Sequence, residues 1–96
     1  MNYTQKELDG IKGHVEKTLK ADYGNAAVAS LAIEADKDNQ SVLAITTGSA
    51  LGDVTAKVRF SNEVLERAKS DLKTLSLVVD KLKAQSVRAV TAKAFE

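Results

Sequence analysis

The sequence predicts an α+β fold, a two-layer sandwich in which two helices pack on one face of a mostly antiparallel three- or four-stranded sheet, in the order α-β-β-β-α(-β). Three observations predict it. Residues 4–24 and 61–84 repeat apolar side chains every three or four positions, as helices with one buried face do. Residues 25–60 alternate apolar and polar side chains, as half-buried strands do. A polar turn at 36–39 and a glycine-containing turn at 48–53 divide this middle part into strands.

The composition is that of one folded domain, residues 1–96. Apolar residues make up 44% of the chain and charged residues 28%, which is ordinary for a globular protein. Cysteine is absent, so disulfides and thiolate metal sites are excluded. No apolar run approaches the roughly 20 residues that span a bilayer, and the N-terminus has no signal-peptide pattern. We therefore expect a cytoplasmic protein without membrane contact or cofactor.

The first helix has a clear N-terminal signal. Thr4 and Glu7 are spaced as a capping box, in which each side chain binds the other residue's backbone N–H. Tyr3 and Leu8 occupy the positions of a hydrophobic staple across this cap. Gly24 is suited to the left-handed conformation that ends many helices. The buried stripe is expected to contain Leu8, Ile11, Val15 and Leu19.

Three strands are expected next. Residues 25–36 and 40–47 are joined by the short segment 36–39, which predicts an antiparallel hairpin. Residues 54–60 alternate most cleanly, with Thr55, Lys57 and Arg59 on the polar side. The inward side chains of the three strands are expected to include Leu31, Ile33, Leu43, Ile45, Val54, Val58 and Phe60.

A second helix is expected to begin at the cap Ser61, with Phe60 and Leu65 as its staple pair. Its apolar stripe contains Leu65, Ala68, Leu72, Leu75, Val79 and Leu82. Val78 borders this stripe and Leu77 lies nearly opposite to it. Because both lie outside the stripe, we expect Leu77 and Val78 to take part in self-association.

The segment 86–95 has two interpretations. A helix continuing through it would place Lys83 and Ser86 on the apolar face, so we expect the helix to end near Ala84 and 86–95 to form a fourth strand. The alternative is one helix that continues to about residue 94. Residues 54–57 and 90–93 are both Val-Thr-Ala-Lys, a pattern typical of a half-buried strand. If both are strands, Lys57, Arg59 and Lys93 share the polar face of the sheet.

No catalytic or metal-binding pattern is complete. His14 is the single histidine, and its place beside the apolar stripe of the first helix favours a structural role. The segment 48–52, Gly-Ser-Ala-Leu-Gly, does not have the serine position of a nucleophile elbow. Asp36 and Asp38 resemble the start of a calcium loop, but the glycine and final glutamate of such a loop are missing. We therefore expect a protein that is not an enzyme and has no metal site.

The leading functional hypothesis is a non-enzymatic protein–protein interaction module. Small domains of this composition occur among adaptors, inhibitors and phage-encoded accessory proteins. The apolar residues outside the stripe, Leu77 and Val78, and the open edges of a small sheet favour self-association, with a dimer as the first expectation. An unidentified protein partner is also expected.

The alternative is a weak nucleic-acid-binding protein. Residues 54–96 carry a net charge of +4, whereas residues 25–53 carry −3. The candidate contacts are Lys57, Arg59, Lys81, Lys83, Arg88 and Lys93. Double-stranded-RNA-binding domains share the helix–strand–strand–strand–helix order. Their Gly-Pro-x-His turn is absent from residues 36–39, and the second helix opens with acidic instead of basic residues.

Overall fold

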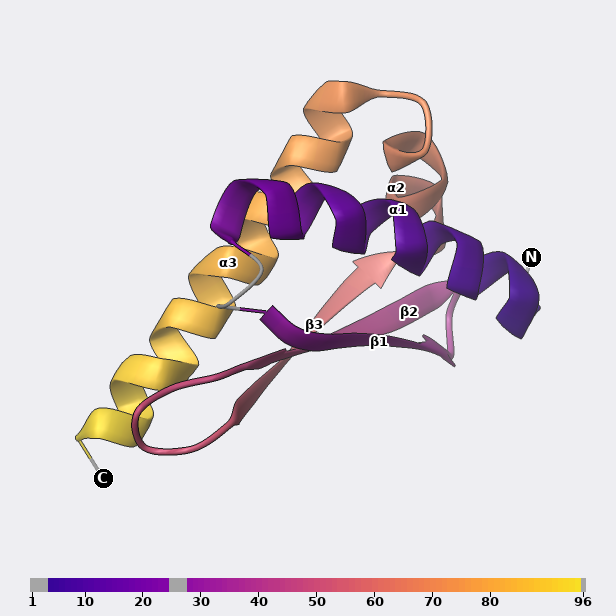
Figure 1. The fold of residues 1–96 in the computed structure, drawn as a ribbon. Helices are drawn as coiled ribbons and strands as arrows, with labels where there is room; N and C mark the ends of the chain where they lie inside the picture. Colours follow the sequence, from indigo (N-terminus) through magenta and orange to yellow (C-terminus); the bar gives the residue numbers. More distant parts are fainter. Residues whose placement is uncertain (1–3, 25–27, 96) are drawn as a thin grey trace.

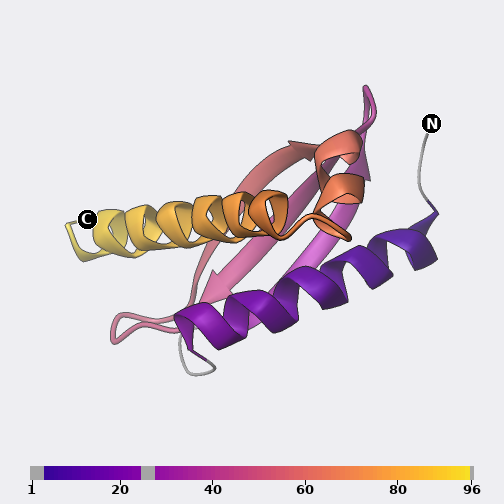
Figure 2. The same ribbon diagram turned by 90° about the horizontal axis from the view of Figure 1, so that it is seen from above.

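A computed structural model describes residues 4–24 and 28–95, apart from the side chain of Ala29. The elements are α1 (Gln5–Tyr23), β1 (Val28–Asp36), β2 (Gln40–Thr47), β3 (Val54–Ser61), α2 (Asn62–Ala68) and α3 (Leu72–Ala94). All three helices lie on one face of a three-stranded antiparallel sheet (Figures 1 and 2). The predicted α+β sandwich is confirmed, and its second predicted helix is divided into α2 and α3.

The sheet has the strand order β1-β2-β3, so β2 is the central strand. Both pairs are antiparallel, and the predicted hairpin joins β1 to β2. Asp38 and Asn39 in its turn have φ angles of 61° and 55°. Aspartate and asparagine tolerate this left-handed region better than other residues with a side chain, which explains why this polar segment forms the turn. No helix within residues 4–24 and 28–95 is long and apolar enough to cross a membrane.

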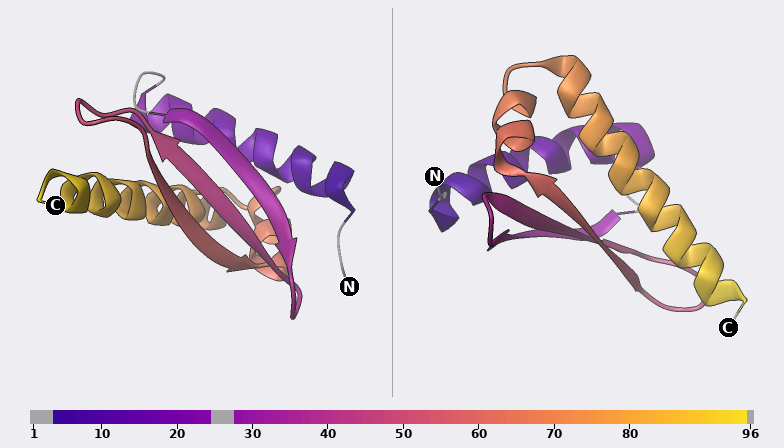
Figure 3. Two further views of the ribbon diagram at one scale, coloured as in Figure 1. Left: turned by 90° about the horizontal axis from the view of Figure 1, so that it is seen from below. Right: turned by 180° about the vertical axis from the view of Figure 1, so that it is seen from behind.

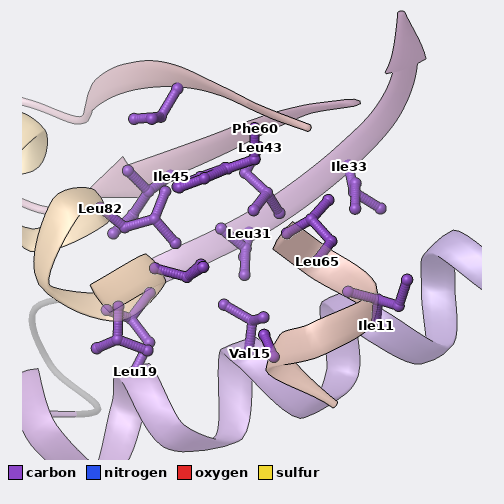
Figure 4. Packing of buried hydrophobic residues seen from close by; sticks show 14 of the residues in the cluster. Ile11, Val15, Leu19, Leu31, Ile33, Leu43, Ile45, Phe60, Leu65 and Leu82 are labelled. Carbon is purple, nitrogen blue, oxygen red and sulfur yellow. The ribbon is translucent and has the colours of Figure 1, made fainter. Parts of the chain in front are cut away.

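The core lies between the sheet and the helices (Figure 4). It combines the stripe of α1, the inner faces of the three strands and the buried sides of α2 and α3. Most of the predicted core residues are buried there. Val54 is only half-buried at the start of β3, and Leu72 is exposed at the start of α3.

The N-terminal cap of α1 is confirmed. The Thr4 hydroxyl accepts from the Glu7 backbone N–H at 3.2 Å, and the Thr4 backbone N–H donates to the Glu7 carboxylate at 3.2 Å. Gly24 ends the helix with a φ angle of 109°. Ser61 likewise caps α2, because its hydroxyl accepts from the Val64 backbone N–H. The predicted staple of α1 involves Tyr3, which lies outside the described residues.

The prediction of one continuous helix over 61–84 was wrong. The chain turns at residues 69–70, and Asp71 begins a new helix by accepting from the Lys73 backbone N–H and the Thr74 hydroxyl. A single helix from residue 61 to 94 would be about 50 Å long at 1.5 Å per residue. Because the turn folds α3 back over the sheet, the longest extent of the molecule is only 40 Å. Leu72 is exposed because it falls at this turn.

The predicted fourth strand at 86–95 was also wrong. The end of the alternative helix, at about residue 94, is confirmed, although that helix begins at Leu72 and not at Ser61. The two residues that argued against a helix have partners. Ser86 is buried and shares a hydrogen bond with the hydroxyl of Thr47 on β2. Lys83 lies at the side of α3, where its Nζ donates to Asp22 at 2.9 Å. The second Val-Thr-Ala-Lys segment is therefore helical, while the first lies in β3.

Polar side chains mark both ends of the buried face of β2. At one end Ser41 donates to the Asn62 side chain of α2 at 2.6 Å, and at the other Thr47 pairs with Ser86 of α3. All four residues are buried, with Leu43 and Ile45 between the two pairs. The pairs hold α2 and α3 at set positions along the central strand, because a slip would leave buried hydroxyl groups without partners. This packing directs the other face of the sheet outward.

Candidate interaction surfaces

The outer face of the sheet is not covered by any helix in the described part of the chain (Figure 3, left). Strand pairing arranges its side chains in rows across the three strands. One row contains Glu34, Val42 and Arg59, and the next contains Ala32, Ala44 and Lys57. Small side chains near the centre leave a shallow hollow of about 460 Å³ over these rows. We refer to this surface as the outer sheet face.

Charge is divided across the outer sheet face. Glu34 and Asp36 lie on β1, whereas Lys57 and Arg59 lie on β3. Between them, β2 contributes the uncharged side chains Val42 and Ala44. No hydrogen bond or ion pair among the described residues involves the side chain of Glu34 or Lys57. The face therefore has one acidic side, one basic side and a neutral centre.

One ion pair crosses this face. The Arg59 Nε donates to Asp36 Oδ2 at 2.7 Å, which links β3 to the end of β1 across the central strand. The backbone N–H of Lys37 and the nearby Arg59 guanidinium hold the pKa of Asp36 below its ordinary value of 3.8, and the N–H of Lys37 is the larger cause. Both groups favour the charged form of the Asp36 carboxyl. The ion pair with this carboxylate positions Arg59 over the neutral centre of the face.

We expect a carbon-detected NMR titration to give a pKa for the Asp36 carboxyl below 3.8. Arg59→Gln should raise this pKa only part of the way towards 3.8, because the Lys37 backbone N–H remains. Since the folded-state pKa is lowered, the contribution of Asp36 to stability is complete above about pH 4. It is lost as the pH falls through the folded-state pKa. A full return to 3.8 in Arg59→Gln would show that Arg59 is the main cause.

The structure separates the six predicted nucleic-acid contacts. Lys57 and Arg59 lie on the outer sheet face, near the acids of β1. The other four, Lys81, Lys83, Arg88 and Lys93, lie on α3, which packs on the opposite face of the sheet. Lys57, Arg59 and Lys93 do not share one sheet face, because the condition for it, a strand at 86–95, is not met and Lys93 belongs to α3.

Lys83 connects two helices. Its Nζ donates to Asp22 of α1 at 2.9 Å and lies 5.9 Å from the centre of the Tyr23 ring. The hydrogen bond to Asp22 raises the pKa of Lys83 above its ordinary value of 10.5. These contacts give Lys83 a structural role at the junction of α1 and α3.

The two residues predicted for self-association are also separated. Leu77 is 69% exposed, whereas Val78 is 1% exposed and belongs to the core. Val78 as a surface contact was therefore wrong, because the buried side of α3 is wide enough to include Val78 beside the predicted stripe residues Val79 and Leu82.

Two further apolar residues are exposed, Val87 on α3 at 52% and Phe95, the C-cap residue that follows α3, at 85%. Sequence reasoning missed them because it treated 86–95 as a strand. A helical projection continued through 86–95 would have placed Phe95 on the same side as Leu77, eighteen residues earlier and about five turns away. Leu77 and Phe95 thus mark one exposed side of α3.

His14 lies at an exposed position of α1, away from the residues of the outer sheet face. Within residues 4–24 and 28–95, no three His, Cys, Asp or Glu side chains are grouped so that they could hold a metal ion.

The comparisons with known proteins add no functional information, since no protein-family model, curated protein or solved structure matches the chain.

Proposed function

We propose that this protein is a non-enzymatic protein–protein interaction module that forms a homodimer through the outer sheet face. One observation supports this proposal above the others, the division of that face into an acidic side on β1 and a basic side on β3. A homodimer with two-fold symmetry places the same patch on both subunits, so the patch has to be complementary to itself. A face with opposite charges on its two sides meets this condition.

The charge pattern favours one orientation of the two copies. A two-fold axis parallel to β2 places β1 of each copy opposite β3 of the other, because the rotation exchanges the two sides of the face. Glu34 then faces Arg59 of the second copy, since both lie in the same row. A two-fold axis perpendicular to the strands would instead bring β1 against β1 and acids against acids. The favoured orientation keeps the strands of the two sheets aligned, as in known sheet-on-sheet packing.

The dimer is expected to be weak. Three strands about 4.8 Å apart and eight residues long present an area of roughly 14 by 27 Å. This is about half of the roughly 800 Å² that each partner buries in a standard stable interface. Exposed ion pairs add only about 0.2–1 kcal/mol each and are screened by salt. A dissociation constant on the order of 100 μM at low salt is therefore expected.

Sedimentation equilibrium on samples from about 10 μM to about 1 mM tests the dimer at low salt. Glu34→Arg and Arg59→Glu should each weaken dimerisation by roughly 3- to 30-fold, because a two-fold interface repeats each lost contact. Combining the two substitutions exchanges the two charges that face each other in one row and should restore much of the affinity.

Leu77→Ser is the matched control, since Leu77 lies on the helical layer and should leave the dimer unchanged. Circular dichroism spectra of all variants should coincide, because every substituted side chain is exposed. A monomer at about 1 mM and low salt would exclude the dimer. A combined variant that is weaker than both single variants would exclude the proposed orientation.

Nucleic-acid binding is the second candidate function, and the charge of α3 favours it. The helix contains five Lys or Arg and one Asp, a net charge of +4. A nucleic acid would contact α3 alone, because Lys57 and Arg59 lie in the other layer. Counterion release predicts an affinity that falls steeply with salt. Absence of binding to duplex or single-stranded probes at about 50 mM salt would exclude this function.

A further inference from the structure

The exposed side of α3 is a second surface, separate from the outer sheet face. The helix packs against β3, α2 and α1, and it lies in the helical layer on the far side of the sheet (Figure 2). Leu77 lies on its exposed side, and Phe95, the C-cap residue, follows eighteen residues later, about five helical turns along the same side. Val87 lies between them along the axis and about 80° to one side. The exposed fractions of the three side chains are 69%, 85% and 52% for Leu77, Phe95 and Val87.

Basic residues flank this apolar line. Lys73 and Lys81 lie one turn before and after Leu77, and Arg88 returns to the same side after about three turns. All three are exposed. Asp80 is the single acid between residues 72 and 94. We refer to Lys73, Leu77, Lys81, Arg88 and Phe95 as the α3 face.

We propose that the α3 face binds an acidic amphipathic helix of another protein. Such a helix offers carboxylates to Lys73, Lys81 and Arg88, and its apolar side chains can cover Leu77 and Phe95. Anchors spaced along one helical side are the usual contacts of a helix that docks on a complementary surface. A second copy of this chain does not fit, because its own α3 would bring the same positive charges against this face.

The α3 face distinguishes a protein ligand from other anions. A nucleic-acid backbone provides phosphates for Lys81 and Arg88. It provides no apolar groups that would cover the exposed Leu77 and Phe95. An anionic membrane surface also combines charge with an apolar region, so lipid vesicles are a necessary comparison. The proposal does not depend on the sheet-mediated dimer, since the two surfaces lie on opposite layers of the fold.

Fluorescence anisotropy with the full chain and a labelled synthetic peptide tests the proposal. The peptide contains about three heptads with leucine on one helical side and glutamate on the other. A peptide of the same composition with scrambled order is the control for charge alone. We expect the amphipathic peptide to bind at low salt at least 10-fold more tightly than the scrambled one.

Variants separate the two parts of the α3 face. The double variant Lys81→Glu with Arg88→Glu should weaken peptide binding by at least 10-fold, and Leu77→Ser with Phe95→Ser by about 3- to 10-fold. Lys57→Glu, which lies on the outer sheet face, should leave peptide binding unchanged. Thermal unfolding of each variant should match that of the parent chain because the replaced side chains are exposed.

The same variants are then tested with an RNA duplex, a DNA duplex, single strands and phosphatidylserine vesicles. The proposal is overturned if the amphipathic peptide does not bind, or if it binds no better than the scrambled peptide. It is equally overturned if loss of Leu77 and Phe95 has no effect, or if a nucleic acid or the vesicles bind more tightly than the peptide. Tighter binding of the peptide together with sensitivity to both variant pairs supports it.

Discussion

Replacing Leu82 with alanine is expected to lower the free energy of unfolding by about 2–5 kcal/mol. Leu82 is fully buried in the cluster between α3 and the sheet (Figure 4). Alanine would remove apolar area from the core and leave a cavity that the surrounding helices and strands cannot fully close. A domain of this size has a total stability of roughly 5–14 kcal/mol, so this one substitution would remove a large part of it.

Leu77→Ala is the matched control for Leu82→Ala. The two leucines belong to the same helix, five residues apart, but Leu77 is exposed. Its replacement is expected to change the free energy of unfolding by less than about 0.5 kcal/mol. Urea unfolding followed by circular dichroism at constant pH measures both variants. Similar losses in the two variants would contradict the orientation of α3 on the sheet.

The strands and the first helix could be predicted because their signals are local. Alternation of apolar and polar residues separates the two faces of a strand, and the capping pair Thr4 and Glu7 marks where α1 begins. The outward direction of Lys57 and Arg59 followed from the same alternation. The row that joins Glu34 to Arg59 could not be predicted, because it depends on the register of both strand pairs.

The C-terminal helix was missed because its polar residues find distant partners. Ser86 pairs with Thr47, 39 residues earlier, and Lys83 pairs with Asp22, 61 residues earlier. Judged by helical periodicity alone, Lys83 and Ser86 are polar residues that interrupt the apolar face of the helix. The two Val-Thr-Ala-Lys segments also show that local sequence does not decide the conformation here, since one is a strand and the other is helical. Their neighbours in space, and not their four residues, decide the conformation.

The α3 face was hidden for the same reason. A strand over 86–95 would have turned alternate residues inward, so no pattern connected Phe95 with Leu77. With 72–94 helical, Leu77 and the C-cap residue Phe95 are both exposed and are about five helical turns apart. The turn at 69–70 had one local signal, the spacing of Asp71 and Thr74, in which aspartate can cap a new helix. That signal was weaker than the apolar repeat across it, which continues through Leu72 and Leu75.

The buried pair of Thr47 and Ser86 leads to the second prediction of large effect. Replacing Ser86 with alanine is expected to lower the free energy of unfolding by about 1–3 kcal/mol, because it leaves the buried Thr47 hydroxyl without its partner. Thr47→Val, which keeps the shape of the side chain, should be less harmful. The remaining Ser86 hydroxyl can then donate to the backbone carbonyl one turn earlier in its own helix, as serine often does.

The double variant Thr47→Val with Ser86→Ala distinguishes a specific pair from two independent polar residues. With both hydroxyls gone, no buried polar group lacks a partner, so the combined loss should be smaller than the sum of the single losses by about 0.5–2 kcal/mol. Urea unfolding of the four proteins at one pH completes the cycle. Additive losses would show that the two hydroxyls do not depend on each other. A non-additive result would establish that the two hydroxyls depend on each other. Ser86 can then lie on the buried side of α3 because Thr47 of β2 supplies the hydrogen-bond partner that an isolated helix does not have.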